Sequence, residues 1–479
     1  MQSKQSFIKV KPYKHQQDAV QFAKEVMGYG AGEPKSKSVA VLAEMGTGKS
    51  LITITLAAEL FMNKHIEKML VVAPLSITGV WKEEFAKFAD FPYTLEILTG
   101  TAEDKKKAFD RLNNAEGLKV AVINYESAWR MEAELAFWRP NLIVADESTK
   151  IKTPSAKQSK AMHRLGRVSK HNIILTGTPI TNNPLDFFSQ YKFLDEKVFG
   201  SSFFVFRARY AIMGGYGNHA IVGYKNLGDL TRKAHAIAYR ITKAEALDLP
   251  EQVDTTLPIE LEPSATRIYA QVERESVAEL ESGEVTATNI LTKLLRLSQL
   301  TGGYLKSDDG ERVQEVSKTK MDALTDIVDE CVAANKKLVI FARFIPEIDA
   351  IERMLAKRKI GYSLIKGDVK DRANQVEQFQ NNSDIKVFVG QLQTTGMGLT
   401  LTAADTAVFY SLSYNFADYE QAKARIHRIG QKNNCTYIHL VATNTIDEKV
   451  MEALKAKKNM ADLVVDNWRT LFRSKGVKP

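Results

Sequence analysis

Short apolar segments, rich in Val, Ile, Leu and Ala and mostly without polar alternation, recur along this chain and limit the folds open to it. In the first half they occupy residues 39–43, 69–73, 120–123, 142–145 and 173–175, and in the second half residues 338–342, 362–365, 386–390, 407–410 and 437–442. Continuous apolar runs are typical of strands buried on both faces of a parallel sheet. The pattern predicts an α/β protein with two tandem, doubly wound parallel-sheet domains.

The sequence between the two sets of segments has a different character. Residues 198–316 contain a Phe-rich stretch, the Gly-rich GGYGNHAIVGY, a Leu-Pro pair and a long helical pattern over 263–300. We interpret them as helical insertions and a linker. The predicted division is therefore 1–197 for the first sheet domain, 198–316 for the insertions, 317–462 for the second sheet domain, and 463–479 for a C-terminal helix and basic tail.

Composition excludes several classes of protein. The chain has 479 residues with 44% apolar and 26% charged side chains, which is ordinary for folded domains and excludes collagen-like and disordered chains. No run approaches the ~20 apolar residues of a membrane-spanning helix. The two cysteines lie far apart, and no Cys/His spacing of the zinc type occurs. We expect a soluble intracellular protein, most readily in the cytoplasm of a prokaryotic or virus-infected cell, with the nucleus left open.

The net charge of +9 is compatible with a polyanionic partner, because Lys and Arg gain by releasing counterions from phosphates. Many basic proteins bind no nucleic acid, so this charge alone does not identify the partner.

The first chemical motif is AEMGTGKS at residues 43–50, between a predicted strand and a helical pattern. This is the context of a Walker A phosphate loop. Gly46 and Gly48 let the backbone N–H groups around Thr47 face phosphate oxygens, and the helix N-terminus adds partial positive charge. Lys49 would reach the terminal phosphates and Ser50 would bind Mg²⁺. Ala43 stands where the general pattern has Gly, so a plain Gly-rich turn remains the alternative.

The second motif is an acidic pair at the end of an apolar run. Asp146 and Glu147 follow the segment 141–145 directly. Triphosphate hydrolysis needs one carboxylate to hold Mg²⁺ and another to orient and deprotonate the attacking water. Asp146 suits the first task and Glu147 the second. An ordinary acidic strand end is the alternative, and in isolation it would be the better interpretation.

Two further motifs gain meaning only beside these. Thr176-Gly177-Thr178-Pro179 follows another predicted buried strand, where a plain turn is the alternative. In QAKARIHRIGQ at 421–431, a helix would place Arg425 and Arg428 on one face. Guanidinium groups on a transferring phosphoryl group stabilise charge that develops in the transition state, whereas a solvated helix face is the alternative.

Taken together, the ordered motifs resemble those of helicase superfamily 2. They are AEMGTGKS, VVAPLSITGVWKEEF, DEST, LTGTP, LVIFARF, TTGMGLTLTAAD and QAKARIHRIGQ, and the resemblance covers nearly the whole chain, from residue 16 to about 463. The run through Gly430-Gln431 and the following TNTIDEKV resembles the Swi/Snf-like double-stranded DNA translocases in particular. The resemblance implies two RecA-like domains that sandwich ATP.

The resemblance also implies roles for further residues. Gln16 would contact adenine, and Gly396 and Gly398 would lie near the nucleotide. Residues in motifs that follow the nucleic-acid backbone would be Pro74, Ser76, Asn124, Tyr125, Thr178, Arg343, Thr394 and Thr395. The acidic motif reads Asp-Glu-Ser-Thr and lacks the His common at its fourth position, which puts the usual coupling of hydrolysis to domain movement in question.

The leading hypothesis is a DNA-stimulated, Mg²⁺-dependent ATPase that translocates along double-stranded DNA, in replication, recombination or repair. Its contacts would be to phosphates and independent of sequence. We expect a monomer with no membrane contact and a recruiting partner that the sequence does not identify. The alternatives are a strand-separating DNA or RNA helicase, a translocating subunit of a nuclease complex, and a nucleotide-gated nucleic-acid-binding protein without turnover.

Overall fold

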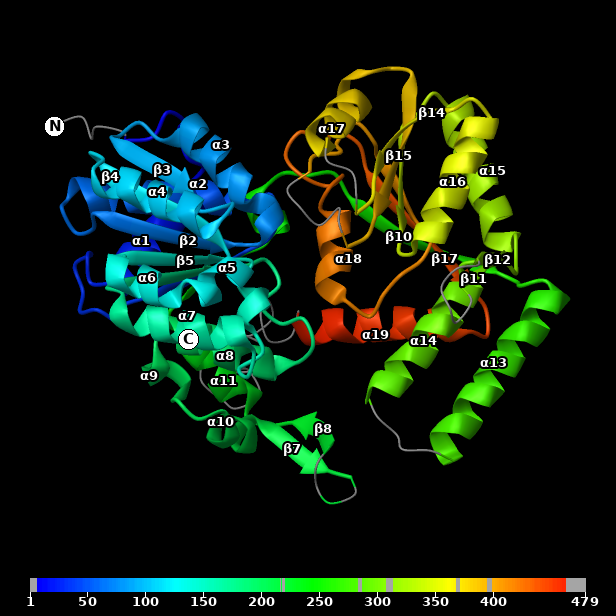
Figure 1. Cartoon of the computed structure of the whole chain (residues 1–479), viewed down its shortest axis with the longest axis horizontal. Coiled ribbons are helices and arrows are strands. Elements are labelled where there is room, and N and C mark those ends of the chain that lie inside the picture. Colours follow the sequence, from blue (N-terminus) through cyan, green and yellow to red (C-terminus); the bar gives the residue numbers. More distant parts are fainter. Residues whose placement is uncertain are drawn as a thin grey trace, which may run out of the picture. The chain divides into compact units, whose positions relative to one another are not determined.

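The computed structural model describes residues 7–215, 217, 220–282, 287–306, 313–367, 371–393 and 399–461. It divides into two compact units, one of Met1–Asp248 with Lys457–Pro479 and one of Leu249–Ala456. Figure 1 shows that each unit is built around its own sheet with helices packed on it.

The first unit contains a seven-stranded sheet in the order β3-β4-β2-β5-β6-β1-β9, and all of its strand pairs are parallel. The strands are β1 (Val39–Ala43), β2 (Lys68–Ala73), β3 (Tyr93–Ile97), β4 (Leu118–Asn124), β5 (Leu142–Asp146), β6 (His171–Leu175) and β9 (Ala238–Ile241). Because the strands are parallel, their carboxyl ends share one edge, where ligands bind in open α/β sheets.

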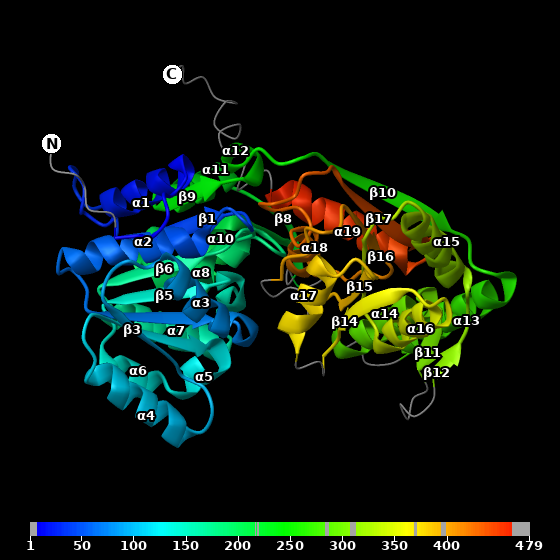
Figure 2. The ribbon, with the colours of Figure 1, turned by 90° about the horizontal axis from the view of Figure 1, so that it is seen from above.

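Helices cover both faces of this sheet (Figure 2). On one face α1, α2 and α3 pack side by side, and on the other α7 packs against α5, α6 and α8. The bounds are α1 (Lys14–Val26), α2 (Lys49–Met62), α3 (Thr78–Phe88), α4 (Ala102–Asn113), α5 (Tyr125–Arg130), α6 (Glu132–Trp138), α7 (Lys157–Val168) and α8 (Phe187–Leu194). The unit also contains α9 (Glu196–Phe199), α10 (Phe203–Tyr210), the antiparallel pair β7 (Ala211–Gly214) and β8 (Ala220–Tyr224), α11 (Leu227–His235) and α12 (Lys243–Ala246).

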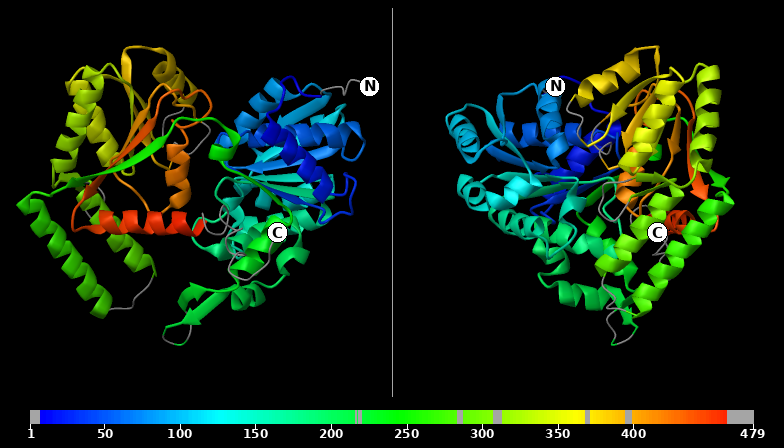
Figure 3. Two further views of the ribbon diagram at one scale, coloured as in Figure 1. Left: turned by 180° about the vertical axis from the view of Figure 1, so that it is seen from behind. Right: turned by 45° about the vertical axis from the view of Figure 1, so that its right-hand side comes forward.

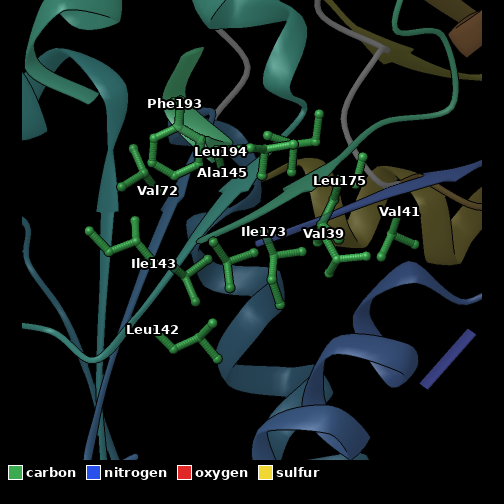
Figure 4. Packing of buried hydrophobic residues seen from close by; sticks show 14 of the residues in the cluster. Val39, Val41, Val72, Leu142, Ile143, Ala145, Ile173, Leu175, Phe193 and Leu194 are labelled. Carbon is green, nitrogen blue, oxygen red and sulfur yellow. The ribbon is translucent and has the colours of Figure 1, made fainter. Parts of the chain in front are cut away.

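The core of the first unit lies between the sheet and its helices. Every residue of β1, β5 and β6 is buried. Figure 4 shows Val39, Ile143 and Ile173 of adjacent strands packed together, with Phe193 and Leu194 of α8 against the same sheet. Burying one such side chain contributes about 1.5–3 kcal/mol, so this core holds the strand ends in fixed positions.

The second unit contains a six-stranded parallel sheet in the order β10-β17-β16-β13-β15-β14. The strands are β10 (Gln252–Ile259), β13 (Leu338–Ala342), β14 (Gly361–Ile365), β15 (Ile385–Gln391), β16 (Thr406–Phe409) and β17 (Cys435–Ala442). Figure 3 shows β10 running along β17 at the edge of this sheet.

Helices also cover this sheet. α15 (Thr319–Ala333) and α16 (Ile345–Lys357) lie on one face, and α17 (Arg372–Asn381) and α18 (Phe416–Lys423) on the other (Figure 1). The remaining elements are α13 (Pro263–Ser282), α14 (Ala287–Thr301), β11 (Tyr304–Lys306), β12 (Val313–Glu315) and α19 (Ile446–Ala461). Of the helices in the described ranges, none combines the length and apolar character needed to cross a membrane.

The predicted fold class is confirmed, and a strand forms at each of the ten predicted apolar segments. The segment predicted as helical insertions and linker contains several strands: each large sheet takes an edge strand from it, β9 and β10, and it also forms the antiparallel pairs β7-β8 and β11-β12. The structure accordingly changes unit at Asp248, whereas the sequence placed the boundaries at 197/198 and 316/317.

Candidate active site

The phosphate loop lies between β1 and α2, as the sequence predicts. Gly46 and Gly48 have φ of 88° and 92°, a left-handed backbone that glycine adopts without strain. A Cβ on Gly48 would lie 2.2 Å from Nε2 of Gln16. The backbone conformation therefore favours glycine at position 48, immediately before α2 begins at Lys49, and a Cβ there would also displace the Gln16 amide.

Two side chains from α1 hold this loop. Gln16 donates from Nε2 to the Thr47 carbonyl oxygen at 3.1 Å, and Nε2 of His15 lies 2.9 Å from the same oxygen. The Gln16 Oε1 accepts from the N–H of Tyr13 at 2.8 Å. Gln16 is thus placed at the loop that should bind the nucleotide, and its contact with adenine stays a prediction.

Within the loop, polar side chains bond to the local backbone. The Thr47 hydroxyl donates to the Glu44 carbonyl oxygen at 2.7 Å, and Nζ of Lys49 donates to the Ala43 carbonyl oxygen at 3.2 Å. Lys49 and Ser50 form the first turn of α2, and both are half-buried. The ammonium group therefore lies folded over the loop, where incoming phosphates would meet it.

Asp146 is the last residue of β5, at the same sheet edge as the loop, and both of its carboxylate oxygens are bonded. Trp81 of α3 donates from Nε1 to Oδ2 at 3.0 Å, and the N–H of Glu147 donates to Oδ1 at 3.0 Å. Burial, with the neighbouring charge of Glu147, raises the pKa of Asp146 to about 6. The positive charge of Lys49 acts in the opposite direction on that pKa, which brings the two predicted motifs into one electrostatic site.

Glu147 has a left-handed backbone with φ of 50° and ψ of 57°. For a residue with a Cβ this conformation costs on the order of 1 kcal/mol or more and occurs preferentially at functional sites. The next residue fixes the turn, because the Ser148 hydroxyl donates to Oε1 of Gln190 at 2.6 Å. Gln190 in turn donates to the Pro179 carbonyl oxygen at 2.8 Å, so the acidic motif is tied to the Thr-Gly-Thr-Pro turn.

The predicted nucleic-acid residues of the first unit lie at or just beyond the carboxyl ends of three strands. Pro74 and Ser76 follow β2, Asn124 ends β4, and Thr178 follows β6. All four are partly exposed. The Asn124 Oδ1 accepts from the N–H of Ser127 at 2.7 Å and caps α5.

Tyr125 differs from the predicted surface role. Its side chain is 1% exposed, and its hydroxyl donates to the Asp146 carbonyl oxygen at 2.8 Å. Burial, with the nearby carboxylates of Asp146 and Glu147, raises its pKa well above the ordinary value. In this structure Tyr125 supports the end of β5 from inside the core and presents no surface to a nucleic acid.

Arg425 and Arg428 of the second unit do not lie in a helix. The sequence predicts a helix there that would place both on one face. α18 ends at Lys423, and residues 424–430 form turns. Gln431 donates from Nε2 to the Ala404 and Ile426 carbonyl oxygens at 2.8 and 3.1 Å, which holds the turns that follow the helix. Arg425 and Arg428 nevertheless converge, since both donate to the Leu399 carbonyl oxygen, at 3.5 and 3.1 Å.

Arg425 is 2% exposed and Arg428 is half-buried. Arg343 follows β13 and is half-buried, and its N–H donates to the Ser411 hydroxyl at 2.8 Å and to Oε2 of Glu347 at 3.2 Å. Burial lowers the pKa of Arg343. Thr394, Thr395, Gly396 and Gly398 lie outside the described residues.

Trp81 and Gln190 are site residues that the motifs did not single out. Trp81 belongs to the quoted run VVAPLSITGVWKEEF. The one feature that could have marked it as a site residue is a Trp beside charged residues. Gln190 lies on α8, with no signal that would distinguish it from a surface glutamine.

A glycine-rich phosphate loop with its lysine, together with an Asp-Glu pair whose Asp146 is buried at the end of a parallel strand, defines a P-loop nucleoside triphosphatase. The SNF2-related domain family matches residues 15–302, and the helicase conserved C-terminal domain matches residues 319–430. The chain belongs to the SNF2-related family and is an ATP-hydrolysing enzyme of helicase superfamily 2.

Several known proteins are similar along most of the chain. An uncharacterized ATP-dependent helicase of Mycoplasma pneumoniae is 27% identical over 90% of this chain and 40% of its own length. A DNA repair and recombination protein RAD54-like of Drosophila yakuba is 25% identical over 95% of this chain and 63% of its own length. The chain thus spans less than two thirds of these relatives.

Among solved structures, the SWI2/SNF2 ATPase core of Sulfolobus solfataricus in complex with dsDNA is 24% identical, with a TM-score of 0.45 over 98% of this chain and 97% of that one.

Proposed function

We propose that this chain is a DNA-stimulated ATPase that translocates along double-stranded DNA, with a role in replication, recombination or repair. The observation that carries the proposal is the joint placement of Lys49, Asp146 and Glu147 at one sheet edge in a chain of the SNF2-related family. The similarity to the RAD54-like protein, whose name gives DNA repair and recombination, supports the choice of substrate and process.

The proposed division of labour follows from charge and position. Backbone N–H groups of the loop and the ammonium of Lys49 bind the phosphates, because the helix N-terminus and the lysine both favour negative charge there. Glu147 orients the attacking water and accepts its proton. Arg425 and Arg428 stabilise the charge that develops on the transferring phosphoryl group.

Mg²⁺ fits the donors at this site. No group of three or more His, Cys, Asp or Glu side chains that could hold a metal occurs among the described residues. A site built from Ser50, Asp146, phosphate oxygens and water needs no such group. When bound, Mg²⁺ supplies charge neutralisation between the phosphate oxygens. The chain's own task is to keep Asp146 ionised, which the hydrogen bond from Trp81 and the charge of Lys49 both favour.

Loss of single groups tests the assignment. Lys49→Ala, Glu147→Gln and Arg428→Ala should each reduce DNA-stimulated phosphate release by about 10³-fold or more, since each removes a group that acts on the transferring phosphate. Arg111→Lys, at an exposed ion pair with Glu96, should retain full activity. Undiminished turnover in any of the first three variants would remove that residue from its assigned role.

A titration of turnover against duplex DNA, single-stranded DNA and RNA tests the substrate. Duplex DNA should stimulate most, and its affinity should fall steeply with salt because the contacts are to phosphates. Displacement of a third strand without separation of the duplex indicates translocation. Separated strands would indicate a helicase, and binding without phosphate release would indicate a nucleotide-gated binding protein.

A further inference from the structure

The first residue after β1, Glu44, is fastened to the strand at the sheet edge. Its N–H donates to the Ile241 carbonyl oxygen at 3.1 Å, and its Oε2 accepts from the N–H of Lys243 at 2.9 Å. Its Oε1 lies 3.4 Å from the guanidinium of Arg240. These contacts join the first free position of the phosphate loop to β9 and to the residues that follow it.

Arg240 binds more than this carboxylate. Its NH1 donates to the Leu42 carbonyl oxygen at 3.0 Å and to the Gly177 carbonyl oxygen at 3.1 Å. Its side chain is 10% exposed. One guanidinium therefore connects the ends of β9, β1 and β6, and so connects the phosphate loop to the Thr-Gly-Thr-Pro turn.

The packing at Gly177 supports the same connection independently. A Cβ on Gly177 would lie 3.2 Å from Cα of Glu44 and 3.3 Å from both the Ala43 oxygen and the Met45 nitrogen. The turn and the start of the loop are thus so closely packed that a side chain at position 177 would press on the loop backbone.

β9 is also the last strand of the first unit before the chain passes into the second. Thr242 caps α12 through a hydrogen bond from the N–H of Glu245 to its hydroxyl at 3.2 Å, and the chain leaves the first unit after Asp248. Glu44 therefore contacts Ile241 and Lys243, which belong to the segment that leads out of the unit.

We propose that Glu44 and Arg240 are positioning residues of the phosphate loop, which fix its shape for the triphosphate and transmit its nucleotide-bound state to residues 240–248. The inference rests on the proposed function, because it assumes that this loop binds ATP. An unanchored loop must be ordered when the phosphates bind, so the expected effect is on affinity more than on the chemical step.

Kinetics provide the first test, with Glu44→Gln and Arg240→Lys. The glutamine keeps an acceptor for the N–H of Lys243 and loses the charge, and the lysine keeps the charge but cannot reach three acceptors. Each variant should raise KM for ATP about tenfold and change kcat by less than about threefold. The KM of the double variant should lie within about twofold of the higher of the two single-variant KM values, because the two side chains act as one unit.

Arg111→Lys is the matched control, since it alters an arginine–glutamate pair of the same unit that lies away from the loop. A purely structural role for Arg240 would lower the thermal midpoint and the active fraction without raising KM. An unchanged KM, or additive effects in the double variant, would overturn the proposal. If the wild-type chain releases no phosphate, the proposed function fails instead.

Hydrogen exchange provides the second test, with a non-hydrolysable ATP analogue at concentrations that saturate each variant. In the wild-type chain the analogue should slow exchange both at residues 43–51 and at residues 240–248. In Glu44→Gln it should protect only residues 43–51. If the analogue slows exchange in the wild-type chain only at residues 43–51, nucleotide binding does not affect residues 240–248. This result would refute the proposed transmission.

Discussion

At the residue scale, the site depends on aromatic side chains as much as on the motif residues. The motifs predicted Asp146 from its place after an apolar run, but not the indole of Trp81 or the phenol of Tyr125 that hold its two ends. Such contacts join positions 65 and 21 residues away from Asp146 in the chain. A single sequence carries no signal for pairs of this kind, because any buried Trp or Tyr satisfies the same apolar pattern.

Trp81→Phe should shift the acid limb of the pH profile. Only ionised Asp146 can hold a cation, so kcat/KM should fall as the pH drops through about 6, where burial places its pKa. The Trp81 hydrogen bond favours the ionised form. Removing it should therefore move the limb of kcat/KM to higher pH.

Trp138→Phe serves as the control, because the buried Trp138 indole N–H has no hydrogen-bond partner among the described residues. An acid limb of kcat/KM that stays in place in Trp81→Phe, or moves equally in both variants, would contradict the assignment.

The contribution of Asp146 to folding stability should change with pH in the opposite direction to kcat/KM. A folded pKa above the unfolded value near 3.9 favours the folded state at low pH, and this contribution is lost as the pH rises through about 6.

At the scale of elements, most of the strands that the sequence predicted are central strands with largely buried residues, and the edge strand β14 was also predicted from its apolar run. β9 and β10 are edge strands, and β10 leaves five successive residues exposed and contains Pro258. An edge strand tolerates polar residues and proline because one of its sides makes no ladder. Its sequence therefore resembles a linker. The prediction of a helix across Arg425 and Arg428 was wrong for another reason, since the turns there are held in part by the bond from Gln431 to Ala404, a residue far away in the sequence.

The anchoring of β10 can be tested at one ion pair. Lys423, 7% exposed, donates from Nζ to both carboxylate oxygens of Asp254 on β10, at 2.9 and 2.6 Å. Asp254→Asn leaves this ammonium buried with weaker acceptors. Because Asp254 is 41% exposed, water offsets part of the cost, and we expect a loss of about 1–3 kcal/mol in denaturant unfolding.

Asp329→Asn is the matched control for this measurement. It removes an exposed pair with Arg358, in which both side chains are over two fifths exposed, and should cost less than about 1 kcal/mol. If the two variants lose equal free energy of unfolding, the Asp254–Lys423 pair contributes no more to stability than an exposed surface pair.

At the scale of the whole molecule, each unit has its own sheet and its own apolar core. A separate apolar core is able to unfold as a cooperative transition of its own. Calorimetry of the full chain should therefore resolve two transitions. Because ligand binding stabilises the folded form, a non-hydrolysable ATP analogue at about 100 times Kd should add about 2.7 kcal/mol to the unit that binds it.

Lys49→Ala should abolish this stabilisation and leave both transitions of the free protein in place. A stabilisation that survives Lys49→Ala would contradict the assignment of nucleotide binding to the first unit, and a single transition in the full chain would show that the two cores unfold together.

The edge position of β9 has a consequence for synthesis of the chain. β1 receives its neighbours only from β6 and β9, so the strand that carries the phosphate loop waits for about 200 further residues before its last partner leaves the ribosome. At ~5–20 residues per second this is roughly 10–40 s. During that interval the apolar side chains of β1 are exposed to chaperones. A pause in translation before residue 238 would lengthen the exposure of β1.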